Sequence, residues 1–150
     1  MSVIRRRDRG QALVEFSLVL IPFLLILMGI IDLGRGIYTA NGVAQATREL
    51  ARATSVHLCD TTKPSCVLGS SPETTDVRGT QDQLVPGLSG ASATVAYTCT
   101  SITDTTVAIK DCGSGDFVKV SVTIPFQVIT PLLSMVAPTT LSSTTHIEIP

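Results

Sequence analysis

The fold is decided by residues 11–31, which read QALVEFSLVLIPFLLILMGII. In an α-helix this segment would be about 30 Å long, which matches the hydrocarbon core of a bilayer. Its single charged residue is Glu15. A carboxylate within a membrane helix costs about 2.5 to 3.5 kcal/mol on insertion scales, so another group must usually neutralise it. The segment therefore predicts a membrane-spanning helix whose one acid needs a counter-charge.

Basic residues directly precede this segment. Four of the eleven Lys and Arg residues are Arg5, Arg6, Arg7 and Arg9, although the net charge of the 150-residue chain is −1. Basic residues beside a spanning helix keep that side in the cytoplasm, so we expect the rest of the chain on the outer side of the membrane. The remainder is mildly acidic and has no basic stripe, which argues against nucleic-acid binding.

The helical pattern continues beyond the apolar segment. A single helix is predicted from about Gln11 to about His57, with an amphipathic second half. Asp32 and Arg35 lie one turn apart on it and predict an ion pair on the helix surface worth a few tenths of a kcal/mol, with a role in subunit contacts as the alternative. The apolar face of the second half is expected to contain Val43, Ala46, Leu50 and Ala53.

Downstream of about residue 58 the composition turns to Ser, Thr, Gly, Pro and Val, which predicts short strands and turns. Ser71, Pro72 and Glu73 predict the start of a short helix that ends near Val85, with an irregular loop as the alternative. Alternating apolar residues then predict an antiparallel sheet of three or four strands, packed on the amphipathic half of the long helix. The expected strand-face residues are Ala93, Val95, Tyr97 and Cys99; Val107 and Ile109; Val118, Val120, Val122 and Ile124; and Leu141, Ile147 and Ile149.

All four cysteines lie after the apolar segment, at Cys59, Cys66, Cys99 and Cys112. An even number of cysteines in a small exported domain predicts two disulfides. We favour pairing Cys59 with Cys66 and Cys99 with Cys112, because each pair flanks a short turn-rich segment. The crossed pairings stay open. A zinc site formed by His57, Cys59 and Cys66 is the less favoured alternative, since no CxxC pair occurs.

Catalytic chemistry is not expected from this sequence. His57 and His146 are isolated, and no Ser or Cys motif accompanies a plausible base. The aspartates occur singly in turns, where they favour local backbone hydrogen bonds. We therefore predict no enzyme activity, no catalytic residues, no cofactor and no metal.

Residues 5–16, RRRDRGQALVEF, resemble the leader junction of type IV pilin precursors, in which a basic leader ends in Gly and Glu is the fifth residue of the mature chain. Residues 31–35, IDLGR, and 46–52, ATRELAR, are similar to characteristic stretches of the TadE-like pilins of tight-adherence pilus systems. Residues 118–126 with 131–133 are loosely similar to the final strands of that family. Residues 59–115 match nothing recognisable.

The resemblance implies that a prepilin peptidase cuts between Gly10 and Gln11 and that the pilus assembly machinery moves the chain from the cytoplasmic membrane into an extracellular helical filament that supports adhesion. Gly10 is then the residue before the cut, Gln11 supplies the new amine, and Glu15 and Phe16 belong to the assembly segment. Physical chemistry supports the pairing of amine and acid. A free α-amine has a pKa of about 7.7 to 8.0, so it is mostly protonated at neutral pH and can neutralise Glu15.

The predicted fold class is α+β, with a long N-terminal α-helix and a small antiparallel β head stapled by disulfides. Residues 1–10 form the leader, 11–58 the long helix and 59–150 the head. A single-span membrane protein that acts as a minor pilin or a priming component is the alternative function. A cleaved secretory signal is a further alternative, but the apolar segment runs into a continuing helix instead of a small-residue cleavage site.

Overall fold

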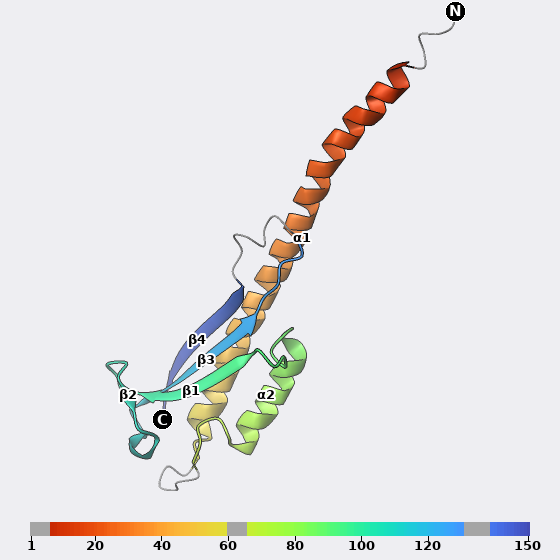
Figure 1. The fold of residues 1–150 in the computed structure, drawn as a ribbon. Coiled ribbons are helices and arrows are strands. Elements are labelled where there is room, and N and C mark those ends of the chain that lie inside the picture. Colours follow the sequence, from red (N-terminus) through yellow and green to blue (C-terminus); the bar gives the residue numbers. More distant parts are fainter. Residues whose placement is uncertain (1–6, 60–65, 131–138) are drawn as a thin grey trace, which may run out of the picture. The chain divides into compact units, whose positions relative to one another are not determined.

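The computed structural model describes residues 7–59, 66–130 and 139–150 (Figure 1). It contains the long helix α1 (Arg7–Val56), the short helix α2 (Pro72–Leu84) and one four-stranded antiparallel sheet. The predicted α+β class is therefore confirmed. The chain divides into two compact units, the first made of residues 1–35 with 128–137 and the second of 36–127 with 138–150.

The sheet belongs to the second unit. Its strand order is β2-β1-β3-β4, and every neighbouring pair is antiparallel. The alternating pattern predicted for β3 is confirmed, because Val118, Val120, Val122 and Ile124 are fully buried while the residues between them are half-exposed. The strands are β1 (Thr94–Thr100), β2 (Thr106–Val107), β3 (Phe117–Pro125) and β4 (Thr140–Glu148).

Three residues expected on strand faces lie outside the strands. Ala93 and Ile149 are each one residue beyond the end of a strand, whereas Ile109 begins the short 3-10 helix η2 (Ile109–Asp111). Val107 is already opposite Cys99 in the β1–β2 ladder, and Cys112 must return to within 6.1 Å of Cys99, measured between Cα atoms, to form their disulfide. The chain therefore turns directly after Val107 instead of extending the strand.

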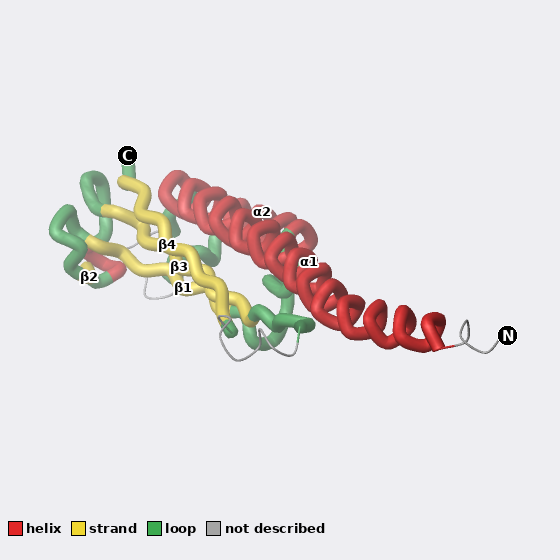
Figure 2. The backbone as a smooth tube through the Cα atoms, turned by 90° about the horizontal axis from the view of Figure 1, so that it is seen from above, coloured by secondary structure: helices red, strands yellow, loops and turns green. Residues whose placement is uncertain are grey.

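The core of the second unit lies between the sheet and the amphipathic half of α1. Figure 2 shows the second half of α1, from Gly36, and α2 on the same face of the strands. Val43, Ala46 and Leu50 are buried there as predicted, but Ala53 is only half-buried. The buried face of α1 also includes Ala51, Thr47 and Thr54.

Two fully buried threonines of α1, Thr47 and Thr54, are compatible with the core because their hydroxyls are satisfied within the helix. Thr47 Oγ1 donates to the Val43 carbonyl at 2.6 Å, and Thr54 Oγ1 donates to the Leu50 carbonyl at 2.8 Å. These i to i−4 bonds leave only the methyl groups to face the sheet. A hydrophobicity pattern that scores Thr as polar therefore misses part of the packing face.

Helix α2 begins and ends where its sequence signals predict. Ser71 is the N-cap, and its hydroxyl accepts a hydrogen bond from the Thr74 backbone N–H at 3.2 Å. Pro72 occupies the first turn, and the helix stops at Leu84 with Val85 in an extended conformation. The predicted short helix is therefore confirmed over the irregular loop.

Both favoured disulfides are present, Cys59–Cys66 and Cys99–Cys112. Cys99 and Cys112 are buried within the core, whereas Cys59 and Cys66 are half-buried. The crossed pairings that the sequence left open are thereby excluded. Because the cysteines are oxidised, Cys59 and Cys66 are not available as the thiolate ligands of the alternative zinc site.

Replacing Gly69 by Ala should destabilise the chain by about 2 kcal/mol or more, because the new methyl group overpacks the core and strains the backbone. The added Cβ would lie 2.6 Å from a ring carbon of Tyr97, and Gly69 has a φ of +81°. Chemical denaturation of the purified chain in detergent measures the loss. Gly79→Ala is the matched control, since Gly79 lies inside α2 with nothing within 4 Å of its Cβ position. It should gain about 0.5 to 1 kcal/mol from helix propensity, and equal effects of the two changes would contradict this account.

Candidate functional site

The predicted processing and assembly residues all lie on one continuous stretch of α1. The helix runs through the Gly10–Gln11 bond, and Gly10, Gln11, Glu15 and Phe16 are all exposed. Gln11 and Glu15 are four residues apart, so helical geometry places them on the same side of α1. A new amine at Gln11 would therefore start one turn from the carboxylate of Glu15.

The apolar half of α1 is uncovered in the monomer. The helix contains a window of mean hydropathy 2.6 in which no residue is buried, and Phe16, Ile21 and Phe23 are 64%, 64% and 57% exposed. Apolar surfaces of this extent mark a membrane or partner contact. Among the described residues, α1 is the one helix that is both long enough and apolar enough to cross a membrane. This is compatible with membrane anchoring.

The predicted topology residues are only partly covered by the structure. Arg5 and Arg6 lie outside the described residues. Arg7 and Arg9 belong to the first turn of α1. Their proposed role in orientation therefore stays a prediction from the sequence.

Asp32 follows the apolar segment directly and is almost completely buried, with 4% of its surface exposed. Its carboxylate accepts hydrogen bonds from the connection between β3 and β4. Ile129 N–H donates to both carboxylate oxygens at 3.2 and 3.1 Å, and Thr130 donates from its N–H at 2.7 Å and its hydroxyl at 2.6 Å. We refer to this arrangement of Asp32, Ile129 and Thr130 as the Asp32 anchor.

The Asp32 anchor revises the simple ion pair expected from the sequence. Arg35 does approach Asp32, at 3.2 Å between Nη1 and Oδ1, but the carboxylate is not a surface group. The hydrogen bond from the Thr130 hydroxyl lowers the pKa of Asp32, and it does so against the opposing effect of burial; the two backbone donors and Arg35 act in the same direction. The anionic form of Asp32 is therefore the one that holds the connection to α1.

Replacing Asp32 by Asn should loosen the connection, because one amide oxygen replaces two charged acceptors and the amide NH₂ cannot accept. We expect faster hydrogen exchange at the Ile129 and Thr130 amides, measured by mass spectrometry on the purified chain. Asp104→Asn is the matched control, since Asp104 is an exposed turn residue that contacts Lys119 at 3.2 Å. Unchanged exchange at residues 129 and 130 in the Asp32 variant would contradict the anchor.

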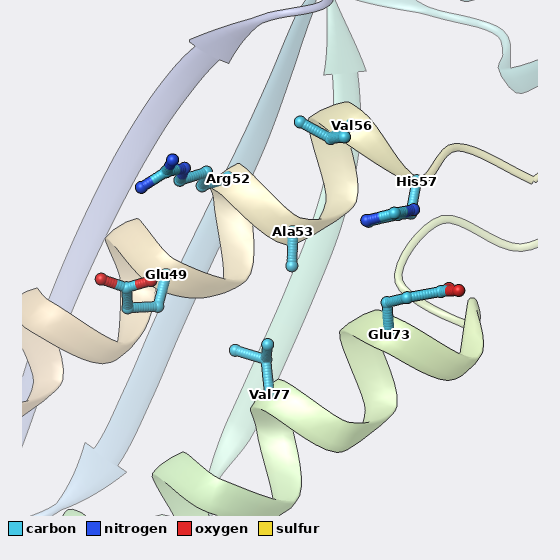
Figure 3. Close-up of a pocket in the computed structure, with 7 residues that line it drawn as sticks. All are labelled: Glu49, Arg52, Ala53, Val56, His57, Glu73 and Val77. Atoms are coloured by element: carbon cyan, nitrogen blue, oxygen red, sulfur yellow. The ribbon is translucent and has the colours of Figure 1, made fainter.

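A groove of about 340 Å³ lies between α1 and α2 in the second unit (Figure 3). Ala53 and Val77 form its apolar part, while charged side chains from both helices surround it. Among the described residues that line it, there is no Ser, Thr or Cys nucleophile beside His57. The lining residues are Glu49, Arg52, Ala53, Val56, His57, Glu73 and Val77.

One cluster of potential metal ligands occurs among the described residues, formed by Cys99, Cys112 and Asp116. The two sulfur atoms are bonded to each other in the disulfide, so they cannot act as thiolate ligands. The Asp116 carboxylate accepts a hydrogen bond from the Gly113 N–H at 3.1 Å and so stabilises the turn before β3. The proximity of these three residues is therefore explained by the disulfide and the turn.

Comparison with known proteins supports the resemblance of the N-terminal third. Residues 10–52 match the family described as TadE-like protein. No curated protein and no solved structure matches the chain. The matched range contains Gly10, Gln11 and Glu15 as well as Asp32, so it covers both the predicted assembly segment and one half of the anchor. The match supports a TadE-like, pilin-related N-terminal helix, and it does not extend to the rest of the chain.

Proposed function

We propose that the chain is a structural pilin subunit. The precursor lies in the cytoplasmic membrane with its N-terminus in the cytoplasm, a prepilin peptidase cleaves it after Gly10, and α1 then polymerises into an extracellular Tad-like pilus that supports adhesion. The observation that carries this proposal is the uncovered apolar half of α1 within a TadE-like match. A filament core built from such helices would bury this surface as completely as a bilayer does.

Charge supplies the register in this proposal and apolar packing supplies the cohesion. The protonated amine of an incoming Gln11 pairs with the Glu15 carboxylate of a neighbouring subunit within the apolar core. A buried charge that lacks its partner is strongly unfavourable, so axial positions that leave the two groups apart are disfavoured. The same two groups sit one turn apart within each chain, so each subunit can also shield its own acid before assembly.

N-terminal sequencing of the chain recovered from filaments tests the proposal directly. Gln11 is expected as the first residue, since cleavage creates the amine that Glu15 needs. Finding Arg5 to Arg9 still attached to the filament subunits would remove that amine and overturn the mechanism.

The alternative is a single-span minor pilin or priming component. The TadE-like match over residues 10–52 supports it as well, because both functions use the same membrane-held helix. Quantitative mass spectrometry of purified filaments separates the two functions. A shaft subunit is the dominant protein of the filament, whereas a minor or priming component is present at a small fraction of it or stays in the membrane.

A further inference from the structure

The Asp32 anchor stands at a defined depth in the membrane-held precursor that we propose. If residues 11–31 fill the hydrocarbon core, which is about 30 Å thick, Asp32 is the first helical residue beyond it on the side of the head. Ile129 and Thr130 are hydrogen-bonded to this carboxylate at 2.6 to 3.2 Å. Ile129 and Thr130 are therefore fixed at the same depth, within the same compact unit as the membrane segment.

The anchor separates the polar and apolar parts of this connection. The Thr130 hydroxyl and both backbone N–H groups are directed at Asp32, and Thr130 is only 2% exposed. The Ile129 side chain is instead 60% exposed. At the same level α1 exposes Ile31 and Leu33, which are 53% and 64% exposed. Exposed apolar side chains therefore continue past residue 31, the end of the membrane segment. They come from two parts of the chain, Leu33 on α1 and Ile129 after β3.

A bilayer is the partner that this chemistry fits. Backbone N–H groups cannot enter the acyl region unless they are hydrogen-bonded, because no water is available there to replace the bond. The carboxylate of Asp32 satisfies the N–H groups of Ile129 and Thr130, and those donors in turn satisfy a charge that would otherwise be costly at this depth. The surface at this point presents the branched alkyl side chain of Ile129 together with the Arg35 guanidinium, which contacts Asp32 at 3.2 Å and is 47% exposed; a cation of this kind suits the headgroup level of a bilayer.

We propose that the segment around Ile129 is a second membrane contact, inserted at the boundary between headgroups and acyl chains of the outer leaflet and held there by the Asp32 anchor. The inference rests on the membrane-held precursor of the proposed function. It assigns Asp32 a positioning role, because its hydrogen bonds make an extramembrane connection compatible with the lipid interface. The precursor is thus held at the outer surface by α1 and by Ile129 together.

Tryptophan fluorescence tests this contact with little background, because the chain contains no Trp. The full-length precursor with Ile129→Trp is reconstituted in vesicles of phosphatidylethanolamine and phosphatidylglycerol that carry brominated acyl chains. We expect blue-shifted emission and strong quenching by bromine atoms placed near the headgroup end of the chains. Ile102→Trp is the solvent-exposed reference, since Ile102 is 84% exposed in a turn of the head, and Phe23→Trp reports on the spanning helix.

The reference variants separate failure of this inference from failure of the proposed function. Emission of Ile129→Trp equal to that of Ile102→Trp, with Phe23→Trp quenched, would overturn the second contact and leave the spanning helix intact. An unquenched Phe23→Trp would instead overturn the membrane-held precursor, and the inference with it.

Variants of the anchor test its positioning role. Adding Asp32→Ala to Ile129→Trp should reduce the quenching severalfold, because the carboxylate that holds both amides is gone. Adding Thr130→Val should reduce it less, since this change removes only the hydroxyl donor and keeps Asp32. This milder variant keeps the test valid if the Asp32 variant does not fold. Quenching that is unchanged in both variants would show that the contact does not depend on the anchor and would overturn that part of the proposal.

Discussion

Replacing Glu15 by Gln is expected to abolish normal filaments while leaving the chain in the membrane. The change keeps the size of the side chain but removes the charge that pairs with the Gln11 amine. Breaking one partner of a buried ion pair typically costs about 3 to 5 kcal/mol, and each 1.4 kcal/mol is about tenfold in affinity. Addition of a subunit should therefore weaken by more than about a hundredfold. Filament yield by electron microscopy and chain content of the membrane fraction measure the two effects.

Glu49→Gln is the matched control for this experiment. It makes the same chemical change on the same helix, but Glu49 is exposed beyond the apolar segment and lines the groove between α1 and α2. Filaments should form normally in this variant. Normal filaments from the Glu15 variant would show that Glu15 is merely tolerated near the membrane surface, and would remove the charge-based register from the mechanism.

Replacing Leu50 by Ala should have the largest effect on the stability of the head. Leu50 is completely buried between α1 and the sheet. Loss of a buried Leu side chain costs about 2 to 5 kcal/mol, because transfer free energy is lost and the cavity that remains closes only partly. Denaturant unfolding of the purified chain in detergent should show a lower midpoint with an unchanged slope.

Leu84→Ala is the matched control, because it makes the same substitution at an exposed position and so isolates the effect of burial. Leu84 is the last residue of α2 and is 59% exposed. Surface changes of this kind usually alter stability by no more than about 0.5 kcal/mol. A similar loss in both variants would mean that the helix–sheet interface is not the stabilising core.

Local sequence signals predicted the elements whose causes are local. The alternation of β3 arises because successive strand residues face opposite sides, and the start of α2 arises from capping by Ser71. The disulfides followed from short turn-rich segments between neighbouring cysteines. In each case the residues that interact are close together along the chain.

The wrong or incomplete predictions concern contacts that another part of the fold imposes. Ile109 lies in a 3-10 helix instead of a strand because the Cys99–Cys112 disulfide requires the chain to turn at that point. Thr47 and Thr54 are buried in the core because their hydroxyls donate hydrogen bonds to carbonyl oxygens of the same helix. Only their methyl groups are then left to pack. The polarity of the residues alone predicts neither the turn at Ile109 nor the burial of the two threonines.

By itself the sequence determined a membrane-length helix with one acid, its amphipathic continuation, a small antiparallel sheet with two disulfides and a TadE-like N-terminal segment. Only the tertiary structure decided what Asp32 binds. Its partners lie 97 and 98 residues away, and two of the donors are backbone N–H groups. Nearly every residue carries such a group, so no residue type in the sequence marks Ile129 and Thr130 as the ones that meet this carboxylate.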